Sequence, residues 1–196
     1  MLSLEKSGAF CRKIEKRQIM DYKALLMDEA QMMRSLARIT HEIIEKNRGC
    51  ENLMLMGVKR RGIHLAHILC ENIKKFEGTE VPVGYVDIAG YRDDNDSRAP
   101  DKADCLFPES VTDKTVIIVD DVISTGRTTR AAIEAVFANG RPRAIQLAVL
   151  IDRGHRELPI KADYVGKNVP TSKDEFIAVS VLDLDGEFRV VLEDKK

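Results

Sequence analysis

The sequence is poor in cysteine and has no long apolar run. Its four cysteines, Cys11, Cys50, Cys70 and Cys105, lie far apart, and no two of them form a C-x-x-C pair. This spacing indicates neither a zinc site nor the disulfide framework of a secreted domain. No apolar stretch approaches the roughly 20 residues of a membrane span, and residues 1–20 lack the apolar core of a signal peptide. We therefore expect a cytoplasmic protein with no membrane partner.

The sequence also lacks an excess of charge of either sign. Its 31 Lys and Arg residues nearly balance 32 Asp and Glu residues, which leaves a net charge of −1 at pH 7. Any contact with nucleic acid must therefore come from a local basic patch. The 196 residues fit one domain, or one domain with an appendage. We expect residues 1–22 to form an N-terminal extension and residues 23–196 to form the domain.

The stretch VIIVDDVISTGRTT, residues 116–129, joins an apolar run, two acids and a hydroxyl-rich turn. The apolar run Val116–Val119 predicts a strand buried on both faces of a parallel sheet. Asp120 and Asp121 would then project from its carboxyl end, outside the buried strand. A helix is predicted over residues 129–139, and the unpartnered amides of its first turn attract a phosphate.

Two carboxylates beside a phosphate site would repel the anion unless they bind something else. Sugar hydroxyls and a magnesium ion are suitable ligands for them. Neither G-x-x-x-x-G-K-[ST] nor G-x-G-x-x-G occurs, which disfavours nucleoside triphosphate and dinucleotide folds. The alternative is that the acids merely close a strand at solvent and that T-G-R-T is an ordinary helix start.

The whole stretch resembles the phosphoribosyl-diphosphate (PRPP) signature of type I phosphoribosyltransferases. The resemblance implies an α/β fold with a central, mainly parallel sheet flanked by helices, a small hood and a C-terminal hairpin. It assigns Asp120 and Asp121 to catalysis and to the ribose hydroxyls. The loop that would bind PRPP or UMP through the 5′-phosphate comprises Val122, Ile123, Ser124, Thr125, Gly126, Arg127 and Thr128. Magnesium is the implied cofactor, bound mainly through PRPP, and no dedicated metal site in the protein is predicted.

A second anion site is predicted after the apolar strand at residues 53–58. Lys59, Arg60 and Arg61 follow this strand, and ligands of an open α/β sheet bind beyond the carboxyl ends of its strands. By resemblance, Arg60 and Arg61 bind the pyrophosphate of PRPP, and Arg61 also serves catalysis. A basic surface turn is the alternative.

The polar segment from Tyr91 to Asp113 has little periodicity, and loops of this length in compact domains are usually functional or disordered. We expect a mobile lid that brings Arg92 to the pyrophosphate when it closes. His64 and His67 lie in a predicted helix without a carboxylate partner in the nearby sequence, so we interpret them as structural.

A helix predicted from Asp28 to Asn47 carries a basic stripe. Arg34, Arg38 and His41 follow i, i+4, i+7 spacing on a face different from the apolar one. This stripe is a candidate RNA contact, and a plain solvated face is the alternative.

The C-terminal third predicts a strand at residues 144–151, hood segments at 152–159 and 162–170, and a hairpin. The hairpin strands are Phe176–Leu182 and Phe188–Leu192, joined through Asp185-Gly186.

The stretch LAVLIDRGHRELPIKADYVGKNVPTS, residues 147–172, is similar to a narrower family. Its members regulate bacterial pyrimidine operons and are also uracil phosphoribosyltransferases, and MGVKRRG and YRDD belong to the same resemblance. It implies PRPP and uracil as substrates, UMP and diphosphate as products, UMP or UTP as bound nucleotides, pyrimidine operon leader mRNA as a partner, and a homo-oligomer. Arg153 and Val169 would contact the base, and His155 and Arg156 would join the basic stripe on RNA. Two alternatives stay open: a salvage transferase without RNA binding, and a nucleotide sensor without catalysis.

Overall fold

The structure is a computed structural model that describes residues 22–91 and 104–194. Arg92, the first part of the predicted lid and nearly all of the predicted extension lie outside the described residues. The elements, in chain order, are β1 (Ala24–Met27), α2 (Glu29–Asn47), β2 (Leu53–Val58), α3 (Arg61–Glu77), β3 (Val83–Val86), the 3-10 turn η1 (Ala89–Tyr91), β4 (Thr115–Ile123), α4 (Arg127–Ala138), β5 (Ala144–Asp152), β6 (Tyr164–Asn168), β7 (Glu175–Ser180), α5 (Leu182–Asp185) and β8 (Arg189–Asp194).

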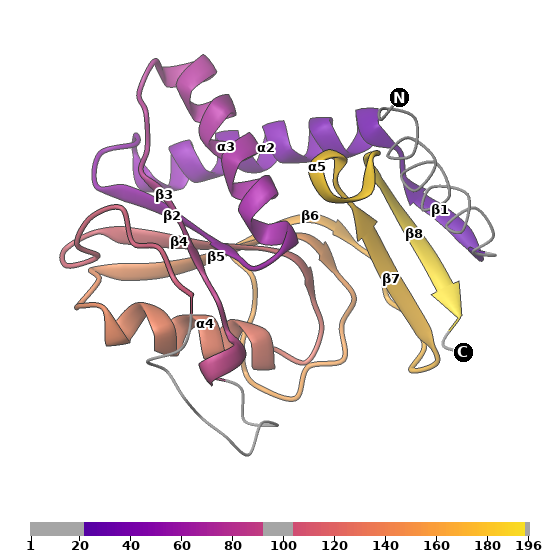
Figure 1. The fold of residues 1–196 in the computed structure, drawn as a ribbon. Coiled ribbons are helices and arrows are strands. Elements are labelled where there is room, and N and C mark those ends of the chain that lie inside the picture. The colour runs from indigo at the N-terminus through magenta and orange to yellow at the C-terminus, as the bar shows by residue number, and fades with distance from the viewer. Residues whose placement is uncertain (1–21, 92–103, 195–196) are drawn as a thin grey trace, which may run out of the picture.

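A five-stranded sheet in the order β3-β2-β4-β5-β6 forms the centre of the fold, and its strands all pair in parallel. Helices α2 and α3 cover one face of this sheet and α4 covers the other (Figure 1). The predicted α/β architecture with a central parallel sheet is therefore confirmed.

The central strands are apolar on both faces because each face packs against helices. In β2, Leu53 and Leu55 pack with the core of α2 and α3, whereas Met54 and Met56 pack with α4. Alternate side chains of a strand point to opposite faces, so a strand covered on both sides needs a continuous apolar run. The sequence meets this need in β2 and in the first half of β4.

Helix α2 begins where the sequence predicts. The Asp28 carboxylate accepts a hydrogen bond from Gln31 N at 2.7 Å, and the Gln31 side chain accepts one from Asp28 N at 2.9 Å. This reciprocal capping box satisfies two amides that lack intrahelical partners. None of the described helices is long and apolar enough to cross a lipid bilayer.

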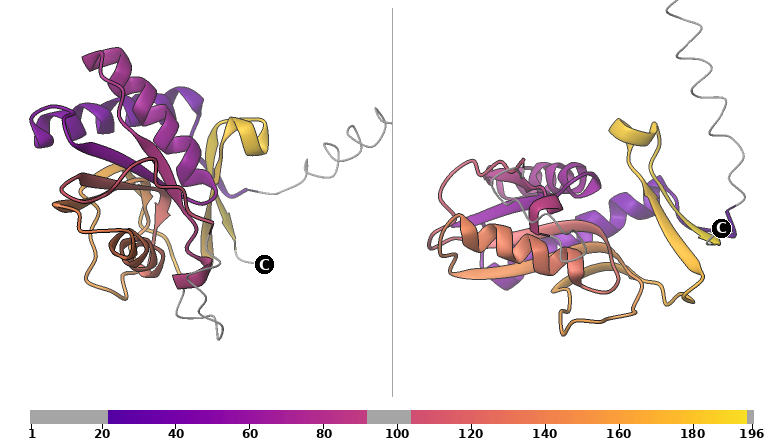
Figure 2. Two further views of the ribbon diagram at one scale, coloured as in Figure 1. Left: turned by 60° about the vertical axis from the view of Figure 1, so that its left-hand side comes forward. Right: turned by 60° about the horizontal axis from the view of Figure 1, so that its bottom comes forward.

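A second, antiparallel sheet in the order β1-β8-β7 lies beside the central one (Figures 1 and 2). Strands β7 and β8 form the predicted antiparallel pair. The connection between them is wrong in the prediction, because the short helix α5 replaces a two-residue turn. Strand β1 was not predicted, because it has only four residues and its sequence, ALLM, does not alternate between apolar and polar residues.

Part of the predicted hood is also wrong. Residues from Tyr164 onward form β6, which pairs in parallel with β5 and makes one edge of the central sheet. Only the first residue of β6 is buried, so its apolar signal is too weak to distinguish an edge strand from a hood segment. Strand β3 has only four residues, and η1 follows it closely.

Candidate functional site

The two acids of the central motif lie inside a strand. Strand β4 continues to Ile123, and its pairing with β5 includes Asp120 opposite Val149 and Val122 opposite Ile151. The prediction that both acids lie outside the buried strand is therefore wrong. Asp120 is 8% exposed, and Asp121 is half-buried. Both acids stay within β4 because the strand continues to pair with β5 beyond them, and a local sequence pattern does not reveal that pairing.

Burial disfavours the ionised form of both carboxyl groups. It raises the pKa of Asp120 well above the usual aspartate value, and the Asp121 carboxylate raises it further. Burial also raises the pKa of Asp121, although hydrogen bonds to its carboxylate and the charge of Arg61 oppose that rise. One oxygen of each carboxylate accepts a backbone amide, from Asp121 N at 2.9 Å and from Val122 N at 2.8 Å. A cation or sugar hydroxyls at the pair would therefore favour its charged form.

The loop after β4 turns into α4 at Gly126. This glycine has φ 91°, in the left-handed region, and α4 begins at Arg127, two residues earlier than predicted. A Cβ on Gly126 would lie 3.5 Å from side-chain carbons of Leu158 and Ile160. The order of strand, loop and helix is confirmed, and the loop lies beside the segment that follows β5.

The basic loop after β2 approaches the acids because two glycines permit it. A Cβ on Gly62 would lie 2.3 Å from Val119 O, and one on Gly57 would lie 2.5 Å from Ile63 Cα. The first turn of α3 therefore lies directly against β2 and β4, which brings the charge of Arg61 within reach of Asp121. The Lys59–Arg60 peptide bond in this loop is cis. Arg60 is exposed.

Arg61 has a partner that the sequence analysis missed. Its Nη2 lies 3.3 and 3.4 Å from the carboxylate oxygens of Asp185 in α5. One turn further along α3, His64 Nδ1 lies 2.8 Å from Asp183 Oδ2, so His64 does have a carboxylate partner. More than a hundred residues separate these pairs in sequence, and no motif indicates them.

The part of the predicted lid that the structure describes is attached beside the basic loop. Lys59 Nζ lies 2.5 Å from Asp104 Oδ2, and Tyr85 OH lies 3.2 Å from Asp104 Oδ1. The backbones of Tyr85 and Leu106 also form an isolated antiparallel bridge.

The predicted base contacts meet at the end of β5. Val169 N donates to Asp152 O at 2.8 Å, and the Arg153 side chain donates to Thr171 Oγ1 at 3.1 Å and to Glu175 O at 2.9 Å. Arg153 and Val169 thus lie near the end of the strand that pairs with the acid-bearing strand.

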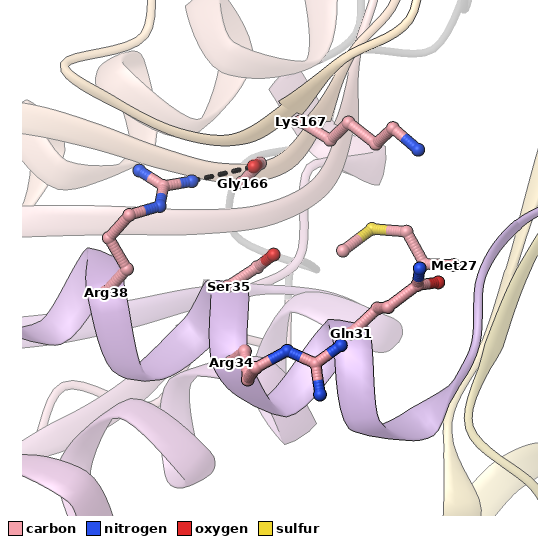
Figure 3. A pocket seen from close by; sticks show the side chains of 7 residues that line it. All are labelled: Met27, Gln31, Arg34, Ser35, Arg38, Gly166 and Lys167. Carbon is pink, nitrogen blue, oxygen red and sulfur yellow. Dashed lines mark hydrogen bonds between the residues drawn. The ribbon is translucent and has the colours of Figure 1, made fainter.

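Two residues of the predicted RNA stripe line a hollow between α2 and β6 (Figure 3). The hollow measures about 340 Å³ and is lined by Met27, Gln31, Arg34, Ser35, Arg38, Gly166 and Lys167. Arg38 Nη2 donates to Gly166 O at 2.7 Å, and the Lys167 side chain approaches from the opposite wall. His41 stacks on Phe76 with ring centroids 4.3 Å apart. The sequence did not predict this hollow, because β6 forms one of its walls and residues 162–170 were interpreted as a hood segment.

His155 and Arg156 contact other segments than this stripe does. His155 Nε2 lies 2.7 Å from Thr171 O. The Arg156 guanidinium contacts Ser124 and Asp152 beside the loop after β4. RNA binding by the five predicted residues stays a prediction, and the structure places them in two groups.

Comparison with known proteins identifies the family. A family model described as the phosphoribosyl transferase domain matches residues 25–184. The bifunctional protein PyrR of Clostridioides difficile (strain 630) is 53% identical over 174 residues, which cover 88% of this chain and 98% of that protein. The bifunctional protein PyrR of Clostridium perfringens (strain SM101 / Type A) is 57% identical over 169 residues, 85% of this chain and 95% of that protein. This chain belongs to the PyrR family.

Solved structures of phosphoribosyltransferases have a similar fold. A hypoxanthine-guanine phosphoribosyltransferase from Bacillus anthracis has a TM-score of 0.67 at 22% identity, covering 89% of this chain and 99% of its own. The hypoxanthine phosphoribosyltransferase of Trypanosoma cruzi has a TM-score of 0.70 at 20% identity, covering 89% and 98%. At these identities the similarity shows the fold alone, and it confirms the predicted type I phosphoribosyltransferase architecture.

Proposed function

We propose that this protein transfers the phosphoribosyl group of PRPP to uracil, giving UMP and diphosphate, and that it binds pyrimidine operon leader mRNA with UMP or UTP bound. The acid pair Asp120–Asp121 carries the transferase half of the proposal. The pair lies directly before the phosphate loop, and the charge of Arg61 acts on Asp121. Membership of the PyrR family supports both halves.

Positioning and electrostatics would supply most of the catalysis. As the bond from the anomeric carbon to diphosphate breaks, positive charge develops on the ribose and negative charge grows on the leaving group. Asp120 and Asp121 would hold the ribose hydroxyls and stabilise the cationic ring, while Arg60 and Arg61 would stabilise the diphosphate. Uracil N1 then forms the new bond to that carbon and loses its proton.

The donor set at the acid pair fits a magnesium ion bound mainly through PRPP. Each carboxylate gives one oxygen to a backbone amide and keeps further acceptor capacity. Among residues 22–91 and 104–194, no three His, Cys, Asp or Glu side chains gather closely enough to hold a metal ion themselves. Magnesium retains several waters and commonly binds through one or two carboxylates plus substrate phosphates. It would neutralise part of the charge on the departing diphosphate.

An assay with several bases tests the transferase half. The protein is incubated with PRPP, Mg²⁺ and either uracil, hypoxanthine or guanine, and nucleotide and diphosphate are quantified separately. We expect UMP and diphosphate in equal amounts with uracil, and no product when a chelator removes Mg²⁺. Product from a purine base alone would overturn the assignment of uracil, and no product from any base would favour the nucleotide sensor.

The RNA half of the proposal relies on the exposed face of α2. Arg34, Arg38 and His41 are all exposed, opposite the buried side of the helix, and Lys167 lines the hollow together with Arg34 and Arg38. Phosphate contacts release counterions locally, so a chain of net charge −1 still binds RNA through such a face. A symmetric homo-oligomer would place two copies of this face on one surface, which suits a folded leader hairpin.

A gel-shift titration with pyrimidine operon leader RNA tests this half. We expect affinity that falls steeply with salt and rises with UMP, because UMP favours the RNA-binding state. Equal affinity for an unrelated hairpin, with no response to UMP, would favour the salvage transferase. Size-exclusion chromatography with light scattering, with and without RNA, measures the oligomeric state.

A further inference from the structure

We propose that Arg156 is a positioning residue for the phosphate loop, and that it holds loop peptide groups so that their amides face the 5′-phosphate of PRPP or UMP. The proposal rests on the proposed function, because it takes the loop at residues 124–128 as the phosphate site. It replaces the predicted RNA role of Arg156.

The Arg156 guanidinium joins the loop to the segment after β5 through four contacts. Its Nη1 donates to Ser124 O at 2.7 Å and to Gly154 O at 3.1 Å. Its Nε donates to Ile160 O at 2.9 Å, and its Nη2 lies 2.6 Å from Asp152 Oδ2. A planar guanidinium offers five donors in a fixed arrangement, so one side chain can fix several carbonyl groups together.

Fixing the Ser124 carbonyl also fixes the amide that follows it. The Ser124–Thr125 peptide is trans, so the carbonyl and the N–H of this planar unit point in opposite directions. Because the Ser124 carbonyl points to Arg156, the Thr125 N–H points away from it. Consecutive N–H groups that point the same way at a helix start form an anion site.

The next peptide group of the loop is held in the same way. Thr125 O accepts hydrogen bonds from Glu157 N at 3.0 Å and Leu158 N at 3.1 Å. The Gly126 N–H is therefore also turned away from the segment after β5. Glu157 lies next to Arg156 in sequence, so one short segment orients both amides.

Arg156 is anchored to the central sheet through Asp152, the last residue of β5. Asp152 Oδ1 also accepts Gly154 N at 2.9 Å, and Asp152 O accepts Val169 N at 2.8 Å. Arg156 thus links the loop to the end of β5, a strand of the central sheet.

These contacts leave Arg156 poorly suited to RNA. Its side chain is 24% exposed, against 48% for Arg38. Turning the guanidinium outward to an RNA phosphate would break its contacts with Ser124, Ile160 and Asp152. A role in RNA recognition would thus disturb the phosphate loop, whereas a positioning role uses the contacts as they stand.

Substitution Arg156→Lys tests the proposal. Lysine keeps the charge, but its single nitrogen cannot reach Ser124 O, Ile160 O and Asp152 together. We expect the KM for PRPP to rise at least tenfold, with kcat at saturating PRPP and the KM for uracil changed less than about threefold. UMP should bind at least tenfold more weakly while uridine, which lacks the phosphate, binds equally well. Lys161→Ala removes an exposed cation of the same segment and should change none of these values.

RNA affinity at saturating UMP separates the two roles of Arg156. We expect Arg156→Lys to keep it within twofold of the parent. A parent-like KM for PRPP together with lost RNA affinity would overturn the proposal. Should Arg156→Lys fail to fold, Asp152→Asn weakens the same anchor and should shift the PRPP and UMP values in the same direction by less. If the parent forms no UMP, the proposed function fails, and the comparison of UMP with uridine still decides the role of Arg156.

Discussion

At the scale of single residues, the main feature is a carboxylate that the fold keeps from water. Asp120 is buried beside a second acid, and an acid whose native pKa is raised binds its proton more tightly in the folded than in the unfolded state. Raising the pH above the unfolded value therefore lowers the free energy of unfolding. At neutral pH, Asp120 therefore lowers the free energy of unfolding. A neutral side chain of the same shape would not have this effect.

We accordingly expect Asp120→Asn to stabilise the ligand-free protein while it lowers turnover. A gain of about 1 kcal/mol would raise Tm by about 2–4 °C for a chain of this size. The gain should be larger at pH 8 than at pH 5. The cost of ionising the buried carboxyl group grows with pH in the parent, and asparagine has no such cost. Thermal unfolding at the two pH values measures it, and a lower Tm for the variant at pH 8 would contradict this account of the acid pair.

The same pKa shifts predict how substrate binding depends on pH. The raised pKa values of Asp120 and Asp121 keep more of the pair protonated as pH falls, and in the proposed function the ionised pair is the form that would hold Mg²⁺ and the ribose hydroxyls. PRPP affinity should therefore rise with pH, and binding should release protons. Calorimetry in two buffers of different ionisation enthalpy counts these protons, and identical heats in both buffers would argue against coupled ionisation.

At the scale of elements, the contact between α3 and the sheet depends on the absence of a side chain at Gly62. Gly62→Ala would place a Cβ 2.3 Å from Val119 O, and overpacking of this kind costs about 1–3 kcal/mol. We expect a lower Tm and a higher KM for PRPP, because Arg61 would move with α3. His67→Ala on the exposed side of the same helix is the control. Parent-like stability and KM in Gly62→Ala would show that this close approach is dispensable.

Helix α2 carries the prediction for RNA. Replacing Arg38 and His41 with alanine should weaken leader RNA binding at least tenfold, while uracil transfer stays near that of the parent, because neither residue contacts the acid pair or its loops. Lys75→Ala, an exposed cation on α3, should leave RNA binding unchanged. If the double variant bound RNA like the parent, the face would be only a solvated surface.

The elements that could be predicted from sequence are those with strong local signals. The bounds of β2 and the start of α2 at Asp28 are as predicted, because a continuous apolar run and the start of an amphipathic helix are local features. The extension of β4 through Asp120 and Asp121 could not be predicted, because pairing with β5 keeps these polar residues in the strand. Helix α5 was missed because four residues with two aspartates look like a turn.

At the scale of the whole molecule, the site draws on segments from across the chain. The acid pair, the loop after β4 and the basic loop after β2 could be located from their motifs and from the order of parallel strands. The pairing of Asp185 with Arg61 and of Asp183 with His64 depends on how the second sheet packs against α3. The contact of Arg156 with Ser124 in the loop after β4 likewise joins segments that are distant in sequence. Such contacts follow from tertiary packing, and no local pattern encodes them.

The most direct test of the central claim is the rate of UMP and diphosphate formation by the parent and by Asp121→Asn. The account predicts turnover of uracil and PRPP by the parent and at least a tenfold lower kcat/KM in the variant, equivalent to about 1.4 kcal/mol of transition-state stabilisation. The Tm of the variant should not fall, because burial also raises the pKa of Asp121. An equal rate in a folded Asp121→Asn variant would contradict the assignment of the acid pair to the ribose of PRPP.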